Sequence, residues 1–119
     1  MIEKSPLVRT VAFIKRNPKL SPEEFKEYWL TKHVPMVKDK LPGLKLYTGR
    51  FPLPTTSTSD AVAPPYDCLV EMGFDSVESL QAAVNGPLFA SADRVKSSET
   101  FMVLPAVQTL VMEEYAVKL

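Results

Sequence analysis

The chain has 119 residues, 45% of them hydrophobic, which suits one compact domain over residues 1–119 that needs no disulfide or metal to hold its core together. Fourteen basic residues balance fourteen acidic ones without a long run of either sign, so the charge pattern excludes a nucleic-acid partner and an anionic membrane partner. The single cysteine, Cys68, excludes an internal disulfide, and no stretch approaches the ~20 apolar residues of a membrane span, so a cytoplasmic location is expected.

The first predicted elements are a strand and a capped helix. Residues 7–15 form a short apolar run rich in β-branched residues and without a helical period, which predicts a strand. Asn17-Pro18 ends it, because proline cannot donate a ladder hydrogen bond. The helix then begins at Ser21, which can act as its cap, with Pro22 in the first turn and Glu24 completing a capping box.

This helix has an apolar stripe that contains the chain's only histidine. The stripe residues recur at intervals of four: Phe25, Trp29, His33, Val37 and Leu41. Pro35 lies inside the helix, where its ring clashes with the carbonyl of Thr31 at a cost of ~3 kcal/mol in a regular helix, so a kink is expected beside His33. Pro42-Gly43 ends the helix.

Two strands and a long loop are predicted in the middle of the chain. Residues 44–51 alternate between apolar and polar positions, and residues 66–74 form a further apolar run, as is typical of strands. Residues 52–65 between them are rich in proline, serine and threonine. At ~14 residues, this loop is long for a compact domain, which favours a functional or mobile segment over a tight turn.

The last third of the chain is predicted to contain two more helical segments and a strand. Asp75 can cap a helix, with Glu78 three residues later as in a capping box. Asn85-Gly86-Pro87 breaks this helix, and Pro87 can open another short one. Residues 106–117 alternate in the manner of one final strand.

The predicted order β-α-β-β-α-β defines an α+β fold of the ferredoxin-like type, in which helices cover one face of a four-stranded antiparallel sheet. The first strand is apolar on both sides, so the other face of the sheet also needs cover. A second copy packed sheet to sheet would provide it, which predicts a twofold homodimer.

Three motifs in this order resemble the EthD family. They are Lys-Arg-Asn-Pro-Lys-Leu-Ser-Pro-Glu-Glu-Phe-Lys-Glu-Tyr-Trp at residues 15–29, Lys-His-Val-Pro-Met-Val at residues 32–37 and Leu-Pro-Gly-Leu at residues 41–44. The second half of the chain resembles the family only in its pattern. The resemblance implies a dimeric α/β barrel whose pocket is lined by the first helix and the sheet.

The resemblance leaves several reactions open. Relatives include ether-degradation accessory proteins, fungal polyketide decarboxylases and dehydratases, and the similar methylmuconolactone methylisomerases. In the last group the active-site pair is a histidine of the first helix and a tyrosine of the second strand, which implies His33 and Tyr47 here. His33, with an ordinary pKa of ~6.5, suits general acid/base catalysis. The alternatives are a buried structural histidine and a tyrosine that only packs on its strand.

Four more residues are candidates for binding a substrate. Trp29, one turn before His33, and Phe13 can wall an aromatic pocket or simply belong to the core. Asp67 can orient the histidine or bind a hydroxyl, and Arg50 can hold a carboxylate, or both can be solvated residues at strand ends. One histidine with scattered carboxylates is a weak metal set and no glycine-rich phosphate loop is present, so a site without metal or cofactor is expected.

The leading hypothesis is a cofactor-independent lyase (decarboxylase or dehydratase) or isomerase that acts on a small aromatic, lactone or polyketide-type compound, with His33 as general acid/base. One alternative is a cofactor-free monooxygenase of anthrone- or quinol-like substrates. Another is a non-catalytic protein that binds a hydrophobic intermediate in a degradation or biosynthesis pathway.

Overall fold

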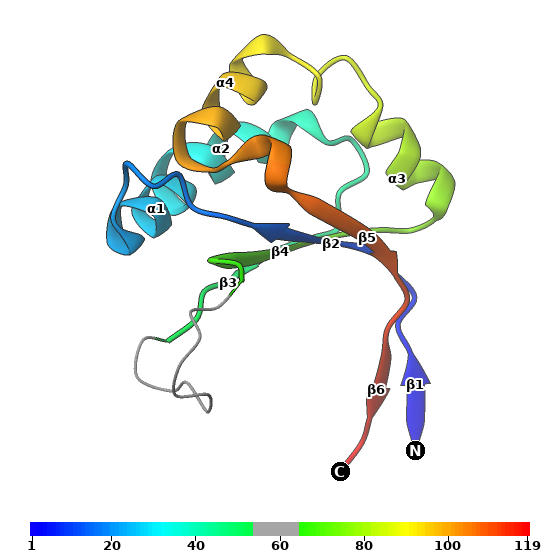
Figure 1. Cartoon of the computed structure of the whole chain (residues 1–119). Helices are drawn as coiled ribbons and strands as arrows, with labels where there is room; N and C mark the ends of the chain where they lie inside the picture. The colour runs from blue at the N-terminus through cyan, green and yellow to red at the C-terminus, as the bar shows by residue number, and fades with distance from the viewer. Residues whose placement is uncertain (54–64) are drawn as a thin grey trace.

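The computed structural model describes residues 1–53 and 65–119, and Figure 1 shows helices gathered on one side of a twisted sheet. The strands are β1 (Ile2–Lys4), β2 (Val8–Ile14), β3 (Leu46–Arg50), β4 (Cys68–Phe74), β5 (Gln108–Met112) and β6 (Tyr115–Val117). The α-helices are α1 (Pro22–Tyr28), α2 (Val34–Val37), α3 (Val77–Val84) and α4 (Ala92–Phe101). Most of the predicted loop at residues 52–65 lies outside the described residues.

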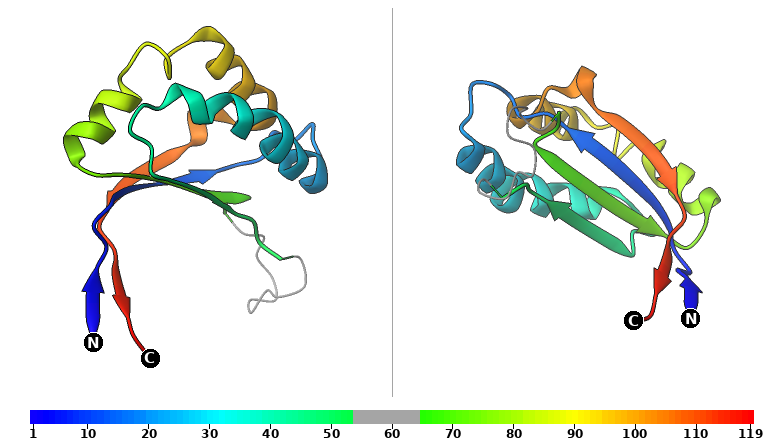
Figure 2. Two further views of the ribbon diagram at one scale, coloured as in Figure 1. Left: turned by 180° about the vertical axis from the view of Figure 1, so that it is seen from behind. Right: turned by 60° about the horizontal axis from the view of Figure 1, so that its bottom comes forward.

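The main sheet has the strand order β3-β4-β2-β5, with every neighbouring pair antiparallel. This order and the helices on one face make the domain ferredoxin-like, so the predicted α+β fold is confirmed. Successive side chains of a strand point to opposite faces. In β2, Thr10, Ala12 and Ile14 therefore face the helices, whereas Arg9, Val11 and Phe13 face the other side. No helix of the described chain covers that second face, which we call the open face (Figure 2).

The chain ends differ from the prediction of one last strand over residues 106–117. The strand breaks after Met112, and β6 pairs with β1 in a separate two-stranded ribbon that projects away from the main sheet (Figure 2). At the break, the carbonyl of Glu114 accepts a hydrogen bond from the Ser5 amide at 2.8 Å, and its carboxylate lies 3.2 Å from the Arg9 guanidinium. These contacts redirect the chain, and alternation in the sequence alone does not reveal them.

Two helix starts also differ from the sequence-based expectation. Ser76, and not Asp75, caps α3: its hydroxyl accepts the hydrogen bond of the Ser79 amide at 3.0 Å. The short helix expected from Pro87 is wrong, because residues 87–90 form turns and α4 begins only after Ser91. Capping residues one position apart look equivalent in sequence, whereas the backbone angles decide which of them caps.

The first helix begins as predicted and then changes its winding. Ser21 and Glu24 form the complete capping box. Residues Trp29–His33 form a π-helical turn, in which the Val34 amide bonds to the Trp29 carbonyl five residues earlier. Pro35 lies two residues after the end of this turn, and its ring requires the carbonyl four residues before it, that of Thr31, to move aside. The steric clash that Pro35 would cause in a regular α-helix is thus relieved by the π turn that ends at His33.

The π turn keeps the apolar stripe on one face of the helix. In a regular α-helix of 3.6 residues per turn, each step of four residues rotates the side chain by about 40°. A stripe of four such steps would wind halfway round the helix. The wider π turn removes part of this rotation, so all five stripe residues, Phe25, Trp29, His33, Val37 and Leu41, are buried as predicted.

Trp29 packs directly on the backbone of Gly49 in β3. A methyl group built on Gly49 would lie 2.6 Å from Cη2 of the indole, closer than carbon atoms approach in proteins. A glycine is therefore required at this point of the strand so that the outer edge of the indole can approach the sheet.

We predict that Gly49→Ala lowers the free energy of unfolding by about 1–3 kcal/mol, because the added methyl group overpacks the Trp29 contact. Urea unfolding measures this loss. In a double-mutant cycle, Trp29→Phe removes Cη2, so Gly49→Ala should cost less unfolding free energy in that background. Strictly additive losses would show that the two residues do not interact and would contradict the prediction.

Candidate functional site

A cavity of about 350 Å³ lies between the sheet and the helices. This volume falls within the range of small-molecule pockets. Its walls come from both buried apolar clusters of the domain: Ile14, Trp29 and Val70 belong to one, and Val37 and Leu80 to the other. The cavity therefore occupies the place where the two halves of the core do not close on each other. The remaining lining residues are Thr10, Ala12, His33, Tyr47, Met72, Val84, Phe89, Arg94, Ser98, Met102, Leu104, Val107, Thr109 and Val111.

His33 lines this cavity and is held in place by α4. It is only 6% exposed. Its Nδ1 lies 2.9 Å from Oγ of Ser97, and its ring packs against Phe101 at 4.6 Å between centroids. The Nε2 atom makes no hydrogen bond to a described residue. One nitrogen of the imidazole is thus anchored, and the other is available to a ligand.

The environment keeps His33 neutral at physiological pH. Burial, together with the positive charge of Arg94, lowers the pKa of His33 to about 4. A neutral imidazole can accept a proton, so His33 is present in the form that a general base requires.

A chain of side-chain hydrogen bonds links His33 to Tyr28. Tyr28 of α1 places its hydroxyl 3.2 Å from Ser97 Oγ, which in turn contacts Nδ1 of His33. If Nδ1 donates to Ser97 and Ser97 donates to Tyr28, then Nε2 carries the lone pair of the imidazole. This arrangement also accommodates the imidazolium, in which Nδ1 remains a donor.

Tyr47 and Trp29 are neighbours in the wall of the cavity. Their rings meet edge to face, with 5.7 Å between centroids and 78° between planes. Burial raises the pKa of the Tyr47 hydroxyl above its usual value, so this group stays protonated and can donate a hydrogen bond. The structure therefore brings together three of the residues expected from the sequence, namely His33, Tyr47 and Trp29.

Arg94 is a residue of the cavity that sequence reasoning missed. It lies on α4, and burial lowers the pKa of its guanidinium. Ser97 was missed as well. Both belong to a helix whose sequence, Ala-Asp-Arg-Val-Lys-Ser-Ser-Glu-Thr-Phe, has no strong apolar stripe, so nothing in it marks these polar residues as inward-facing. Only the structure shows that Ser97 and Ser98, about one turn before Phe101, are buried.

The other three expected binding residues lie outside the cavity lining. Asp67 accepts the backbone hydrogen bond of Arg16 at 2.8 Å and closes the end of β2. Phe13 and Arg50 lie on the open face, where Phe13 packs on Tyr66 at 5.2 Å between centroids. Cys68 is buried, and its burial raises the pKa of its thiol to about 12, which leaves the thiol protonated and unreactive.

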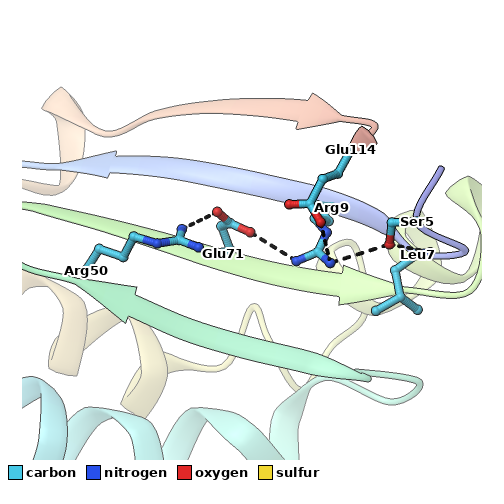
Figure 3. A network of polar contacts seen from close by, with 6 residues as sticks. All are labelled: Ser5, Leu7, Arg9, Arg50, Glu71 and Glu114. Atoms are coloured by element: carbon cyan, nitrogen blue, oxygen red, sulfur yellow. Dashed lines mark hydrogen bonds and ion pairs between the residues drawn. The ribbon is translucent and has the colours of Figure 1, made fainter. Parts of the chain in front are cut away.

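Arg50 belongs to a charged network on the open face (Figure 3). Glu71 of β4 pairs with Arg50 through one carboxylate oxygen and with Arg9 through the other, the latter at 3.2 Å. Arg9 also reaches Glu114 at 3.2 Å and the hydroxyl of Ser5 at 3.4 Å. The geometry thus assigns Arg50 to an ion pair and gives no support to its expected contact with a substrate.

Neither a metal cluster nor a membrane helix is found in the described parts of the chain. Residues 1–53 and 65–119 contain no group of three or more histidine, cysteine, aspartate or glutamate side chains that could hold a metal ion. No helix among these residues is long and apolar enough to cross a membrane.

The fold and the cavity define a small ferredoxin-like domain with a pocket of ligand size. The chain belongs to the EthD family: the model of the EthD domain matches residues 17–103. No curated protein shows significant sequence similarity to it.

Solved structures with the same fold share little sequence with this chain. An ethyl tert-butyl ether d (EthD) family protein from Bacillus halodurans is 20% identical over 95% of this chain and 99% of its own, with a TM-score of 0.60. The At3g17210 protein of Arabidopsis thaliana is 15% identical over 94% and 99%, with a TM-score of 0.63. A dimeric ferredoxin-like protein of unknown function from Thermobifida fusca is 14% identical over 91% and 89%, with a TM-score of 0.58.

We predict that the buried neutral His33 makes the protein sensitive to mild acid. Its pKa is about 4 in the folded chain and ~6.5 when unfolded, so the unfolded state binds the proton first as the pH falls. The stability linked to the neutral His33 is fully present above pH ~6.5. As the pH falls toward ~4, the free energy of unfolding decreases by about 3 kcal/mol. Urea unfolding between pH 7 and pH 4 should show that the wild-type protein loses this much more stability than His33→Gln. If the free energies of unfolding of the two proteins fall in parallel with pH, the prediction is contradicted.

Proposed function

We propose that this chain is a cofactor-independent lyase or isomerase, in which His33 acts as general base on a small, largely apolar substrate of the aromatic, lactone or polyketide type. The observation that carries this proposal is the state of His33: a neutral imidazole, anchored through Nδ1 to Ser97, with Nε2 free of described partners in a cavity of ligand size. The family membership is consistent with such chemistry.

The proposed step is a proton transfer at carbon. Nε2 of His33 removes a proton next to a substrate carbonyl, and the electron pair of the broken C–H bond stays on the substrate as an enolate. Tyr47, protonated and in the cavity wall, is the proposed hydrogen-bond donor to the enolate oxygen. The imidazolium then returns the proton to another carbon in an isomerisation, or gives it to a leaving hydroxide, which departs as water, in a dehydration.

The walls of the cavity support an apolar ring as the substrate skeleton. Trp29 and Phe89 provide aromatic surface, and Ile14, Val70 and Met72 provide aliphatic surface. Few polar groups interrupt these walls, and electrostatic interactions beside such apolar surface are stronger than in bulk water.

We further propose that two copies of the chain form a homodimer through the open face of the sheet. On this face Leu110 of β5 is paired with the buried Val11 of β2, next to the ion pairs of Glu71. Leu110 is 51% exposed in the single chain. The dimeric Thermobifida fusca protein of the same fold supports this assembly.

The catalytic proposal predicts that the protein accelerates hydrogen exchange at the acidic C–H of 2-tetralone, a bicyclic ketone, in D₂O. NMR follows the loss of the proton signal. His33→Gln should reduce the acceleration about 10²-fold or more, because the neutral amide cannot take up the proton. The rate should be flat above about pH 5 and fall as the pH drops through the pKa of His33, about 4 in the free protein.

Cys68→Ala is the control, because this buried thiol lies outside the cavity lining, and exchange should continue. If the wild-type protein binds 2-tetralone without accelerating its hydrogen exchange, the proposed catalysis is contradicted and a non-catalytic binding protein is favoured. Oxygen consumption with a reduced polyphenol would instead favour a monooxygenase.

The dimer proposal predicts that Leu110→Glu produces a monomer, because it places a charge in the apolar centre of the interface. Analytical ultracentrifugation measures the mass. Leu88→Glu is a matched control, since Leu88 is 49% exposed but lies in the turn between α3 and α4, away from the open face. A dimer that survives Leu110→Glu would place the interface elsewhere.

A further inference from the structure

Arg94 is the only charged side chain among the described residues that line the cavity, since His33 is neutral. It reaches the cavity from α4, the same helix that anchors His33 through Ser97. A cation in an apolar pocket is costly unless it has a partner that compensates its charge.

The observed contacts of Arg94 position the guanidinium without neutralising it. Nε donates to the carbonyl of Phe89 at 2.5 Å, and Nη1 lies 3.4 Å from the hydroxyl of Ser98. The guanidinium carbon stacks 4.0 Å above the centroid of the Phe89 ring. All these partners are uncharged.

No described carboxylate forms an ion pair with Arg94. The acid next to it in sequence, Asp93, pairs with Lys40 at 3.0 Å instead. An arginine has five N–H donors, and the two described hydrogen bonds leave donors of its outer fork available. This fork matches the geometry of a carboxylate or another oxygen anion.

We propose that Arg94 is the anion-recognition residue of the cavity, and that the ligand combines an apolar ring-sized skeleton with one anionic oxygen group, which pairs with the guanidinium. The inference rests on the proposed function in that it assigns the substrate class of the same pocket. The anionic oxygen is either a carboxylate that the substrate already carries or the enolate oxygen that His33 generates.

Such an anion would also act on the base. The charge of Arg94 disfavours protonation of His33, alongside burial. Tyr47, in the wall of the same cavity, stays protonated and therefore does not offset this charge. A bound anion beside Arg94 compensates its charge, so ligand binding makes His33 a stronger base.

The test compares two probes of nearly the same shape, naphthalene-2-carboxylate and the neutral naphthalene-2-carboxamide, at pH 7. Calorimetry should show the carboxylate binding about 10- to 100-fold more tightly, as expected for charge-assisted hydrogen bonds to a partly buried guanidinium. NMR of the imidazole, unambiguous because His33 is the only histidine, should show that the probe enters the cavity. Equal affinities, or an unperturbed imidazole, would overturn the proposal without any variant.

Variants then assign the preference to Arg94. Arg94→Gln should abolish the preference for the carboxylate while the amide still binds, and Arg94→Lys should retain part of it because the charge remains. Arg16→Gln is the matched control, since Arg16 also donates to a backbone carbonyl, that of Leu20, but lies outside the cavity lining. A preference that survives Arg94→Gln would overturn the assignment.

A third probe separates the two sources of the anion. 2-Naphthol has the shape of the enol of 2-tetralone and is neutral in water at pH 7. If 2-naphthol ionises on binding, seen as naphtholate absorption, the partner of Arg94 is the enolate oxygen. If 2-naphthol binds in its neutral form while naphthalene-2-carboxylate binds tightly, the partner is a carboxylate that the substrate already carries. Carboxylate binding without any exchange of 2-tetralone would leave this site standing and refute only the proposed catalysis.

Discussion

The π-helical turn at Trp29–His33 is the constraint on which the rest of the domain depends. Without it, an apolar stripe with a repeat of four residues would rotate away from the sheet over the length of the helix. With it, Phe25 and Trp29 enter one apolar cluster and Val37 and Leu41 enter the other. His33 lies between them, so a histidine takes the place on the stripe where the two clusters meet and the cavity opens.

The cavity divides its tasks between the two layers of the domain. The sheet provides mainly apolar walls through the inward faces of its strands, together with the hydroxyl of Tyr47. The helices provide the base, the hydroxyl group that orients it and the cation: His33 from the π turn, Ser97 and Arg94 from α4. Burial of His33 among these walls disfavours the charged imidazolium, and the positive charge of Arg94 adds to this effect, which together explain the low pKa of His33.

The two faces of the sheet show why alternation along a strand matters. A shift of one residue moves a side chain from the cavity to the open face. Tyr47 therefore lines the pocket, whereas Arg50, three residues later on the same strand, faces away and pairs with Glu71. Phe13 is likewise separated from the cavity because its neighbours Ala12 and Ile14 face inward.

The sequence by itself determined the features that depend on local chemistry and period. The capping box at Ser21 and the buried stripe through His33 follow from residue spacing, because neighbours along the chain produce them. The succession of strands and helices along the chain follows from the same local patterns. Only the tertiary structure decided which polar residues share the cavity. Arg94 and Ser97 are more than sixty residues from His33, and no local pattern encodes a contact that forms when two distant helices pack over one sheet.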